Sequence, residues 1–158
     1  MNRLWMGMTV LSVAGIVLFG WLLRKRLIAL QKQHRGYQPP QMRFGYDPAA
    51  LTREWDGMDA QARALLVQFD WLFVPLLFYV GVAMAVVAHN TASLRWMAWA
   101  MNALAAAAVV CGMAESLLLL GEKLTVKAAK VCSLVKWICF GLWVVGMFAG
   151  LFLRSAAL

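Results

Sequence analysis

The sequence is short of charge, and above all of acidic charge. Only 14% of its 158 residues are charged and 63% are hydrophobic, and seven acidic residues stand against fifteen basic ones. A soluble domain carries roughly a quarter charged residues and about half apolar ones. Together with a mean hydropathy of +0.71, this composition excludes a soluble enzyme and a disordered tail. It predicts an integral membrane protein.

Cysteine and histidine are also scarce, with three and two residues. The cysteines all lie in apolar stretches, where thiols pack as small hydrophobic groups, and an odd number cannot pair completely within one chain. The sequence contains no CxxC or HxxxH spacing, no phosphate-binding loop and no nucleophile elbow. We therefore expect no disulfide scaffold, no metal and no cofactor, and no motif specifies an activity.

Four stretches reach the roughly 20 apolar residues that a membrane-spanning helix needs. They cover residues 5–23, 64–88, 96–120 and 131–153. The first is not expected to be a signal peptide, because it lacks a small-x-small cleavage site and its positive cluster follows the apolar run. The sequence predicts an all-α, polytopic bundle of four transmembrane helices, forming a single membrane domain over residues 1–158.

Basic residues are distributed unevenly between the two ends of the predicted helices. Eleven Lys and Arg residues lie in the connections after the first and third spans, and only Arg3, Arg95 and Arg154 lie at the opposite ends. Such an excess marks the cytoplasmic side of a membrane protein. We expect both connections in the cytoplasm and both termini outside. The same charge indicates anionic lipid as a partner and no nucleic acid.

The long first connection, residues 24–63, begins with a basic half. Residues 24–46 carry six Lys and Arg residues and no acid. We expect the first helix to continue through Leu30 and the chain to become extended at Pro39-Pro40. Segment 24–43 is the predicted contact with anionic lipid headgroups.

The second half of this connection carries four acids and two arginines. Asp47 and Pro48 are typical of a helix start, with Asp as the N-cap and Pro in the first turn. An apolar stripe with spacings of four, three and four residues follows, formed by Leu51, Trp55, Met58 and Ala62. We predict a short amphipathic helix on the cytoplasmic interface, at about residues 48–62. Gly57 is a candidate break in it, and Asp59 a candidate cap for the second membrane helix.

Three charged residues lie inside the predicted spans, namely Asp70, Glu115 and Lys136. Each costs roughly 2.5 to 3.5 kcal/mol on insertion scales, so its presence needs an explanation. Counted from the cytoplasmic ends at about 1.5 Å per residue, they lie about 10, 9 and 9 Å deep. Charges at one level on three helices are expected to meet inside the bundle as a cluster of two carboxylates and one lysine.

Small residues share the helical face of Glu115, including Ala108 and Gly112, and they allow close helix approach. Two interpretations of the cluster stay open. It can be a structural clamp that fixes helix packing. Alternatively, Glu115, Asp70 and Lys136 are catalytic candidates in a site that handles protons or substrate.

Short motifs at several positions resemble a group of uncharacterised small bacterial four-helix membrane proteins. The motifs lie within residues 46–153 and comprise Tyr46-Asp47-Pro48, Gln68-Phe69-Asp70, Pro75, Ala114-Glu115-Ser116 and Lys136-Trp137. In that group the third-helix acid is often followed by Asn, where this chain has Ser116. The resemblance implies a bacterial inner-membrane location, with both termini then in the periplasm. It also implies that Asp70, Glu115 and Lys136 act as one unit. It implies no activity.

Three function classes follow as hypotheses. The first is a non-enzymatic membrane module or accessory subunit, whose partner is another membrane protein or a second copy of the chain. The second is an intramembrane enzyme acting on a lipid or isoprenoid-like substrate, with Glu115 as acid or base and Lys136 as electrostatic stabiliser. The third is an oligomeric proton-coupled transporter. A lipid-filled cavity touching Glu115 would favour the enzyme.

Overall fold

The computed structural model describes residues 3–33, 37–92, 94–120 and 126–156. Among these residues it contains helices and no strand. The elements, in chain order, are α1 (Arg3–Gln33), the 3-10 turn η1 (Pro40–Met42), α2 (Pro48–Asp56), α3 (Ala60–Thr91), α4 (Arg95–Leu119) and α5 (Val126–Ala156). Arg35 and Lys123, two of the basic residues used to predict orientation, lie outside the described residues.

Helices α1, α3, α4 and α5 are each long and apolar enough to cross a membrane. The predicted all-α fold, with four spanning helices and a short helix between the first two, is confirmed. Helices α1, α3 and α5 extend beyond the apolar stretches at both ends, and α1 runs 31 residues. Large apolar side chains point outward from them, as Val17 does at 66% exposure and Phe148 at 62%. This outer surface suits lipid, because water would disfavour so much exposed apolar area.

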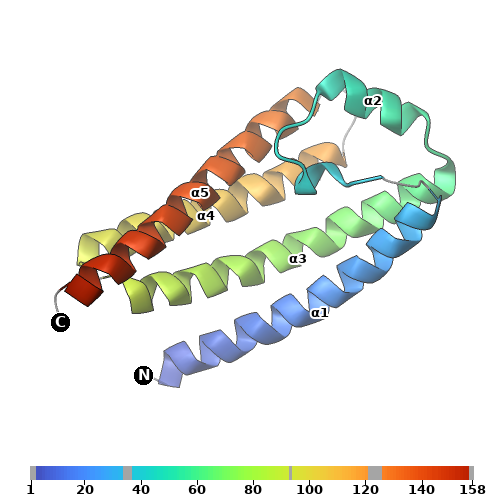
Figure 1. Ribbon diagram of the computed structural model, residues 1–158. Coiled ribbons are helices and arrows are strands. Elements are labelled where there is room, and N and C mark those ends of the chain that lie inside the picture. Colours follow the sequence, from blue (N-terminus) through green and yellow to red (C-terminus); the bar gives the residue numbers. More distant parts are fainter. Residues whose placement is uncertain (1–2, 34–36, 93, 121–125, 157–158) are drawn as a thin grey trace.

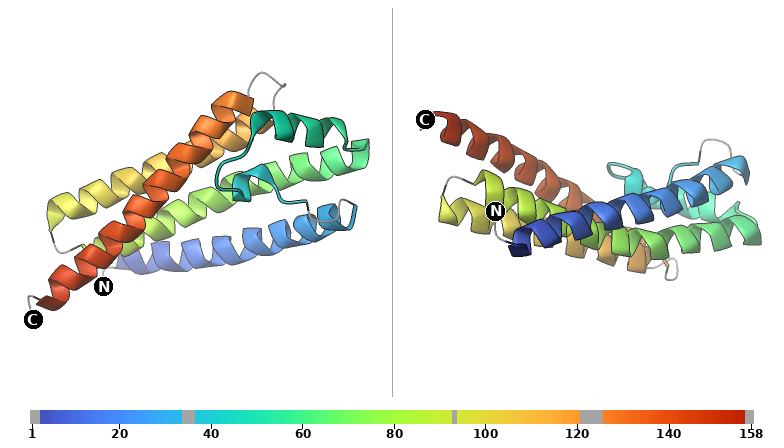
Figure 2. Two further views of the ribbon diagram at one scale, coloured as in Figure 1. Left: turned by 45° about the horizontal axis from the view of Figure 1, so that its top comes forward. Right: turned by 90° about the horizontal axis from the view of Figure 1, so that it is seen from below.

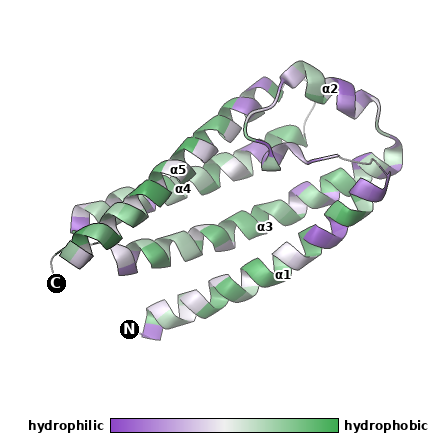
Figure 3. Ribbon diagram, in the orientation of Figure 1, coloured by the Kyte–Doolittle hydropathy of each residue, from purple (hydrophilic) through white to green (hydrophobic). Residues whose placement is uncertain are grey.

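The bundle is built from two helix pairs. Helix α3 packs against α1 on one side and α4 on the other, and α5 packs mainly against α4. The chain ends at Arg3 and Ala156 lie at one end of the bundle, and α2 lies at the other (Figures 1 and 2). Hydrophobic residues colour most of α3, α4 and α5, whereas hydrophilic residues gather near the α2 end of α1 (Figure 3).

Glycines allow close contact between neighbouring helices at two places. A Cβ atom added to Gly15 of α1 would lie 2.3 Å from the ring of Tyr79 on α3, and one added to Gly81 would lie 2.6 Å from Val109 on α4. Real Cβ atoms do not approach that closely. Small residues therefore set the spacing of these helix pairs, as is common in membranes.

The segment between α1 and α3, residues 37–58, folds over the α2 end of the bundle, and we call it the cap. The Asp47 carboxylate accepts hydrogen bonds from the backbone N–H groups of Ala49 and Ala50, so the predicted N-cap of α2 is confirmed. Asp59 caps α3 in the same way through the Ala62 N–H. Helix α2 ends at Asp56, so the predicted range of about 48–62 covers two helices separated by a short break.

The cap joins the two helix pairs through apolar contacts. Tyr37 and Met58 pack with Leu30 of α1 and with the start of α3. Tyr46 and Leu51 pack with the facing ends of α4 and α5. The predicted stripe on α2 therefore lies against the bundle. Protein and lipid both bury an apolar stripe, and the sequence pattern does not distinguish them.

Two local expectations have different outcomes. Helix α1 continues through Leu30, as predicted. The chain at Pro39-Pro40 is extended only at Pro39, because Pro40 begins the 3-10 turn η1. This turn, Pro40–Met42, brings a polar side chain into the bundle.

Candidate functional site: a buried polar network

An ion pair between α4 and α5 forms the centre of the site. The Lys136 Nζ atom lies 2.5 Å from Oε2 of Glu115. Glu115 is 0% exposed and Lys136 is 7% exposed. The structure therefore places these two predicted residues in direct contact away from water, where a hydrogen-bonded ion pair is strong but costly to desolvate.

Asp70 joins the network through a residue that the sequence did not indicate. The Gln41 side chain, from η1, donates a hydrogen bond through Nε2 to Oδ1 of Asp70 on α3. The backbone carbonyl oxygen of Gln41 accepts a hydrogen bond of 2.9 Å from the Lys136 ammonium. Asp70 and Lys136 are thus linked by Gln41, and among the described residues no hydrogen bond or ion pair joins them directly.

Gln41 is 1% exposed and belongs to the cap, so the network spans four elements. Sequence reasoning missed it because a single glutamine after two prolines has no periodic pattern. Its residue type is no signal either, because Gln31, Gln33 and Gln38 lie in the same segment. Its position depends on tertiary contacts with α3 and α5.

The close approach of α4 to the lysine depends on Gly112, one turn before Glu115. A Cβ atom at this position would lie 3.2 Å from Cδ of Lys136 and 2.8 Å from Cδ1 of Leu77. The small residue therefore leaves room for the lysine stem between the helices. This agrees with the expectation that the face of Glu115 carries small residues.

Polar groups beside Glu115 have unused hydrogen-bonding capacity. The Oε1 atom of Glu115 and the hydroxyls of Ser116, Ser133 and Tyr46 are buried and have no hydrogen-bond partner. Ser133 faces the carboxylate without a hydrogen bond of standard geometry. Burial raises the pKa of the Tyr46 phenol, and the negative charge of Glu115 raises it further. Tyr46 is therefore a neutral neighbour of the ion pair.

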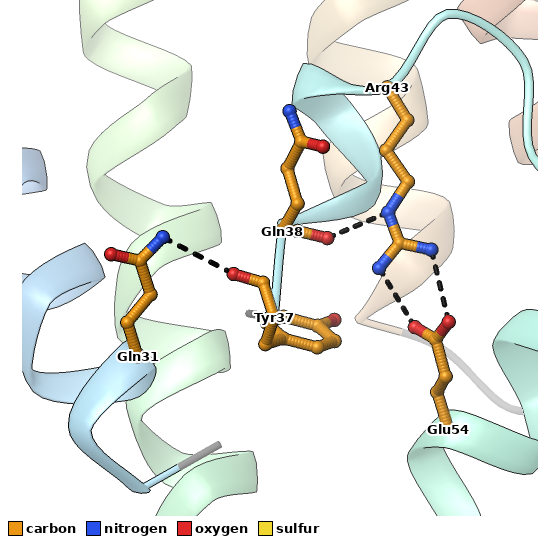
Figure 4. Close-up of polar contacts among 5 residues, drawn as sticks. All are labelled: Gln31, Tyr37, Gln38, Arg43 and Glu54. Atoms are coloured by element: carbon orange, nitrogen blue, oxygen red, sulfur yellow. Dashed lines mark hydrogen bonds and ion pairs between the residues drawn. The ribbon is translucent and has the colours of Figure 1, made fainter. Parts of the chain in front are cut away.

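Arg43 joins two parts of the cap through its side chain (Figure 4) and joins the cap to α5 through its backbone carbonyl group. Its guanidinium donates to both carboxylate oxygens of Glu54, at 3.2 and 2.8 Å, and its Nε donates to the carbonyl of Gln38 at 2.8 Å. The indole N–H of Trp137 on α5 donates to the Arg43 carbonyl oxygen at 3.2 Å. Lys136 and Trp137, adjacent on α5, thus hold two carbonyl groups of the cap.

A partly enclosed cavity of about 170 Å³ lies next to the network, between α3, α4 and α5. Its walls are almost entirely apolar, and Gln41 and Lys136 are the polar residues among those that line it. The lining does not include Glu115 among the residues that the structure describes. The cavity therefore reaches the lysine side of the ion pair and not the carboxylate.

The site as a whole can fix charges in place within the bundle and fasten the cap to it. Comparisons with protein-family models, with curated proteins and with solved structures find no match. The resemblance to small four-helix membrane proteins of bacteria accordingly stays a prediction.

Proposed function

We propose that the protein is a non-enzymatic membrane module or accessory subunit, in which the network of Gln41, Asp70, Glu115 and Lys136 clamps the bundle and its cap. The observation that carries this proposal is the direct contact between the buried Glu115 and Lys136 side chains. Lys136 contacts Glu115 on α4 and the Gln41 carbonyl in the cap. Such contacts hold elements together, because separating the two residues would leave a buried charge without a partner, which is strongly destabilising.

The clamp matters because the cap bridges the two helix pairs. Its apolar contacts reach α1 and α3 on one side and α4 and α5 on the other. A rigid cap gives a small membrane protein a defined surface outside the lipid, to which another membrane protein or a second copy of the chain can bind. The enzyme hypothesis has less support, because its proposed acid, Glu115, does not line the neighbouring cavity among the described residues.

The proposed location is the bacterial inner membrane, with the cap in the cytoplasm and both termini in the periplasm. Support comes from the Lys and Arg asymmetry of the sequence. Arg24, Lys25, Arg26 and Lys32 are exposed on the cytoplasmic part of α1 in this orientation. They are the proposed contact with anionic lipid headgroups.

The experiment is limited trypsin digestion of the purified protein in lipid bilayers, because Arg53 is an exposed cleavage site in the cap. Lys136→Met is expected to raise the rate of cleavage in the cap, since it removes the ammonium that holds the Gln41 carbonyl. It also leaves the Glu115 carboxylate buried without a partner, at a cost of about 3 to 5 kcal/mol. Lys127→Met, at an exposed position on the same helix, is the matched control and should behave like the parent.

A second variant separates the loss of the clamp from the cost of the unpaired Glu115 carboxylate. Glu115→Gln combined with Lys136→Met leaves no charge from the pair inside the bundle, and it should recover part of the stability lost in Lys136→Met alone. Cap cleavage should nevertheless stay faster than in the parent, because the Gln41 carbonyl still lacks its donor. If both variants keep the parent's stability and cleavage rate, the network does not clamp the cap and the proposal fails.

A further inference from the structure

Residues 41–44, which we call the inner edge of the cap, lie beside α5 and inside its apolar stretch. The backbone carbonyl of Arg43 accepts a hydrogen bond from the indole N–H of Trp137. The ring of Phe44 packs edge-on against the same indole, with the ring centres 6.3 Å apart. Trp137 lies seven residues past Lys130, which is about 10 Å along the helix. The inner edge is therefore at the level of the membrane-spanning segments.

Tryptophans on two helices mark the lipid boundary at this level. Trp71 directly follows Asp70 on α3, and Trp137 directly follows Lys136 on α5. Gln41 hydrogen-bonds to both charged residues, so the two tryptophans lie at similar depth. Trp71 is 60% exposed. Tryptophan is enriched where headgroups meet hydrocarbon, because its ring is apolar and its N–H is polar. The inner edge is therefore expected at this boundary.

Two apolar side chains of the inner edge point away from the protein. Phe44 is 73% exposed and Met42 is 44% exposed. On α5 at the same level, Val135 and Ile138 are also apolar and exposed. Contact of so much apolar area with water would be unfavourable, whereas contact with acyl chains is not. The inner edge thus adds to the lipid-facing surface of α5.

The backbone of this segment suits a medium without water. Irregular backbone at membrane depth is tolerated only where its polar groups are bonded within the protein. Pro39 and Pro40 have no N–H group to satisfy. Their carbonyls accept hydrogen bonds of 3.0 Å from the N–H groups of Met42 and Arg43. The carbonyls of Gln41 and Arg43 bind two side chains of α5. This bonding removes most of the cost of placing the segment beside hydrocarbon.

The charged residue of the inner edge, Arg43, extends its side chain toward α2. Its guanidinium pairs with Glu54 of α2, and its Nε donates to the Gln38 carbonyl. Long basic side chains near a bilayer edge commonly reach polar partners in this way, while their backbone stays at the apolar level. The positive charge of Arg43 is therefore held by the cap and not presented to acyl chains.

We propose that the inner edge of the cap enters the adjacent leaflet, with Met42 and Phe44 inserted among acyl chains just below the headgroups, while α2 stays on the aqueous side. The occupant of this surface is lipid and not a second protein chain. Lipid then covers the outer side of the segment that Lys136 holds from within. The proposal requires only that the four helices span a bilayer, so it can fail while the proposed function stands.

The test is the accessibility of nitroxide spin labels to oxygen and to a nickel chelate, measured by electron paramagnetic resonance. Oxygen concentrates in hydrocarbon, whereas the chelate stays in water. The full chain is studied in vesicles of phosphatidylcholine and phosphatidylglycerol. Labels are attached to Phe44→Cys and, separately, to Met42→Cys in a cysteine-free parent. Both positions are exposed, so the labelled variants are expected to fold like the parent.

Two control positions give the reference values. Phe148→Cys lies on the outer surface of α5, and Arg53→Cys lies on the exposed side of α2. At Phe44 and Met42 the ratio of oxygen to chelate accessibility should be severalfold higher than at Arg53 and close to that at Phe148. A ratio equal to that at Arg53 would place the inner edge in water and overturn the proposal. Low accessibility to both reagents would also overturn it, because a protein surface would then cover the inner edge.

Discussion

Gln41 allows a sharp test of the network, because a single amide joins the cap to the buried carboxylate of Asp70. Gln41→Leu keeps the size of the side chain and the backbone carbonyl that Lys136 binds, but it removes the donor to Asp70. Removing the donor and leaving its acceptor buried without a partner costs about 1 to 3 kcal/mol. Asp70 is 1% exposed and has no access to water in its place.

We therefore expect Gln41→Leu to lower the free energy of unfolding by about 1 to 3 kcal/mol. For a chain of this size that corresponds to a fall in Tm of roughly 2 to 12 °C. The assay is reversible unfolding in bicelles, followed by circular dichroism. Gln38→Leu, an exposed position in the same segment, is the control and should change stability by less than about 0.5 kcal/mol.

The double variant Gln41→Leu with Asp70→Leu tests the cause of the loss. It removes the unpaired carboxylate together with its former donor, so it should be more stable than Gln41→Leu alone. If Gln41→Leu matches the Gln38→Leu control, or if the double variant shows no recovery, the hydrogen bond between Gln41 and Asp70 does not hold the cap.

Three further outcomes are expected. Gly15→Ala should separate α1 from α3 and cost about 1 to 3 kcal/mol, whereas Gly20→Ala, with open space around its Cβ position, should be neutral or slightly stabilising in the same unfolding assay. Burial raises the pKa of Tyr46 above the ordinary value of 10.0, so the unfolded chain loses this proton first and the free energy of unfolding should fall as the pH rises above about 10. Tyr46→Phe should reduce that alkaline loss in unfolding curves. An unchanged loss would contradict the conclusion that the Tyr46 phenol is buried and neutral. In a cysteine-free parent within intact cells, a cysteine at Gln38 should be shielded from an impermeant thiol reagent and one at Asn90 labelled, and the reverse pattern would refute the orientation.

Local and compositional signals account for the parts of the fold that the sequence predicts. The four spans follow from apolar length, and the starts of α2 and α3 follow from Asp47 and Asp59, whose carboxylates bind nearby N–H groups. The contact between Glu115 and Lys136 follows from their equal depth on neighbouring helices, because buried charges in lipid need partners.

Features that depend on tertiary contacts were not predictable in this way. Gln41 enters the network because η1 packs beside α4 and Gln41 hydrogen-bonds to residues of α3 and α5. Its neighbours along the chain do not encode that position. The period of the stripe on α2 shows only that one face of the helix is buried, and not which residues cover it. In the structure Leu51 packs against the ends of α4 and α5.

The central claim is that the Lys136 ammonium bridges the bundle and the cap. The most direct measurement is solid-state NMR in lipid bilayers, with nitrogen-15 at the side-chain amine of lysine and carbon-13 at carboxyl and carbonyl positions. The Nζ atom lies 2.5 Å from Oε2 of Glu115 and 2.9 Å from the Gln41 carbonyl oxygen. We predict strong dipolar transfer from Lys136 Nζ to both the Glu115 carboxyl carbon and the Gln41 carbonyl carbon. Transfer to neither carbon in the folded protein would contradict the clamp.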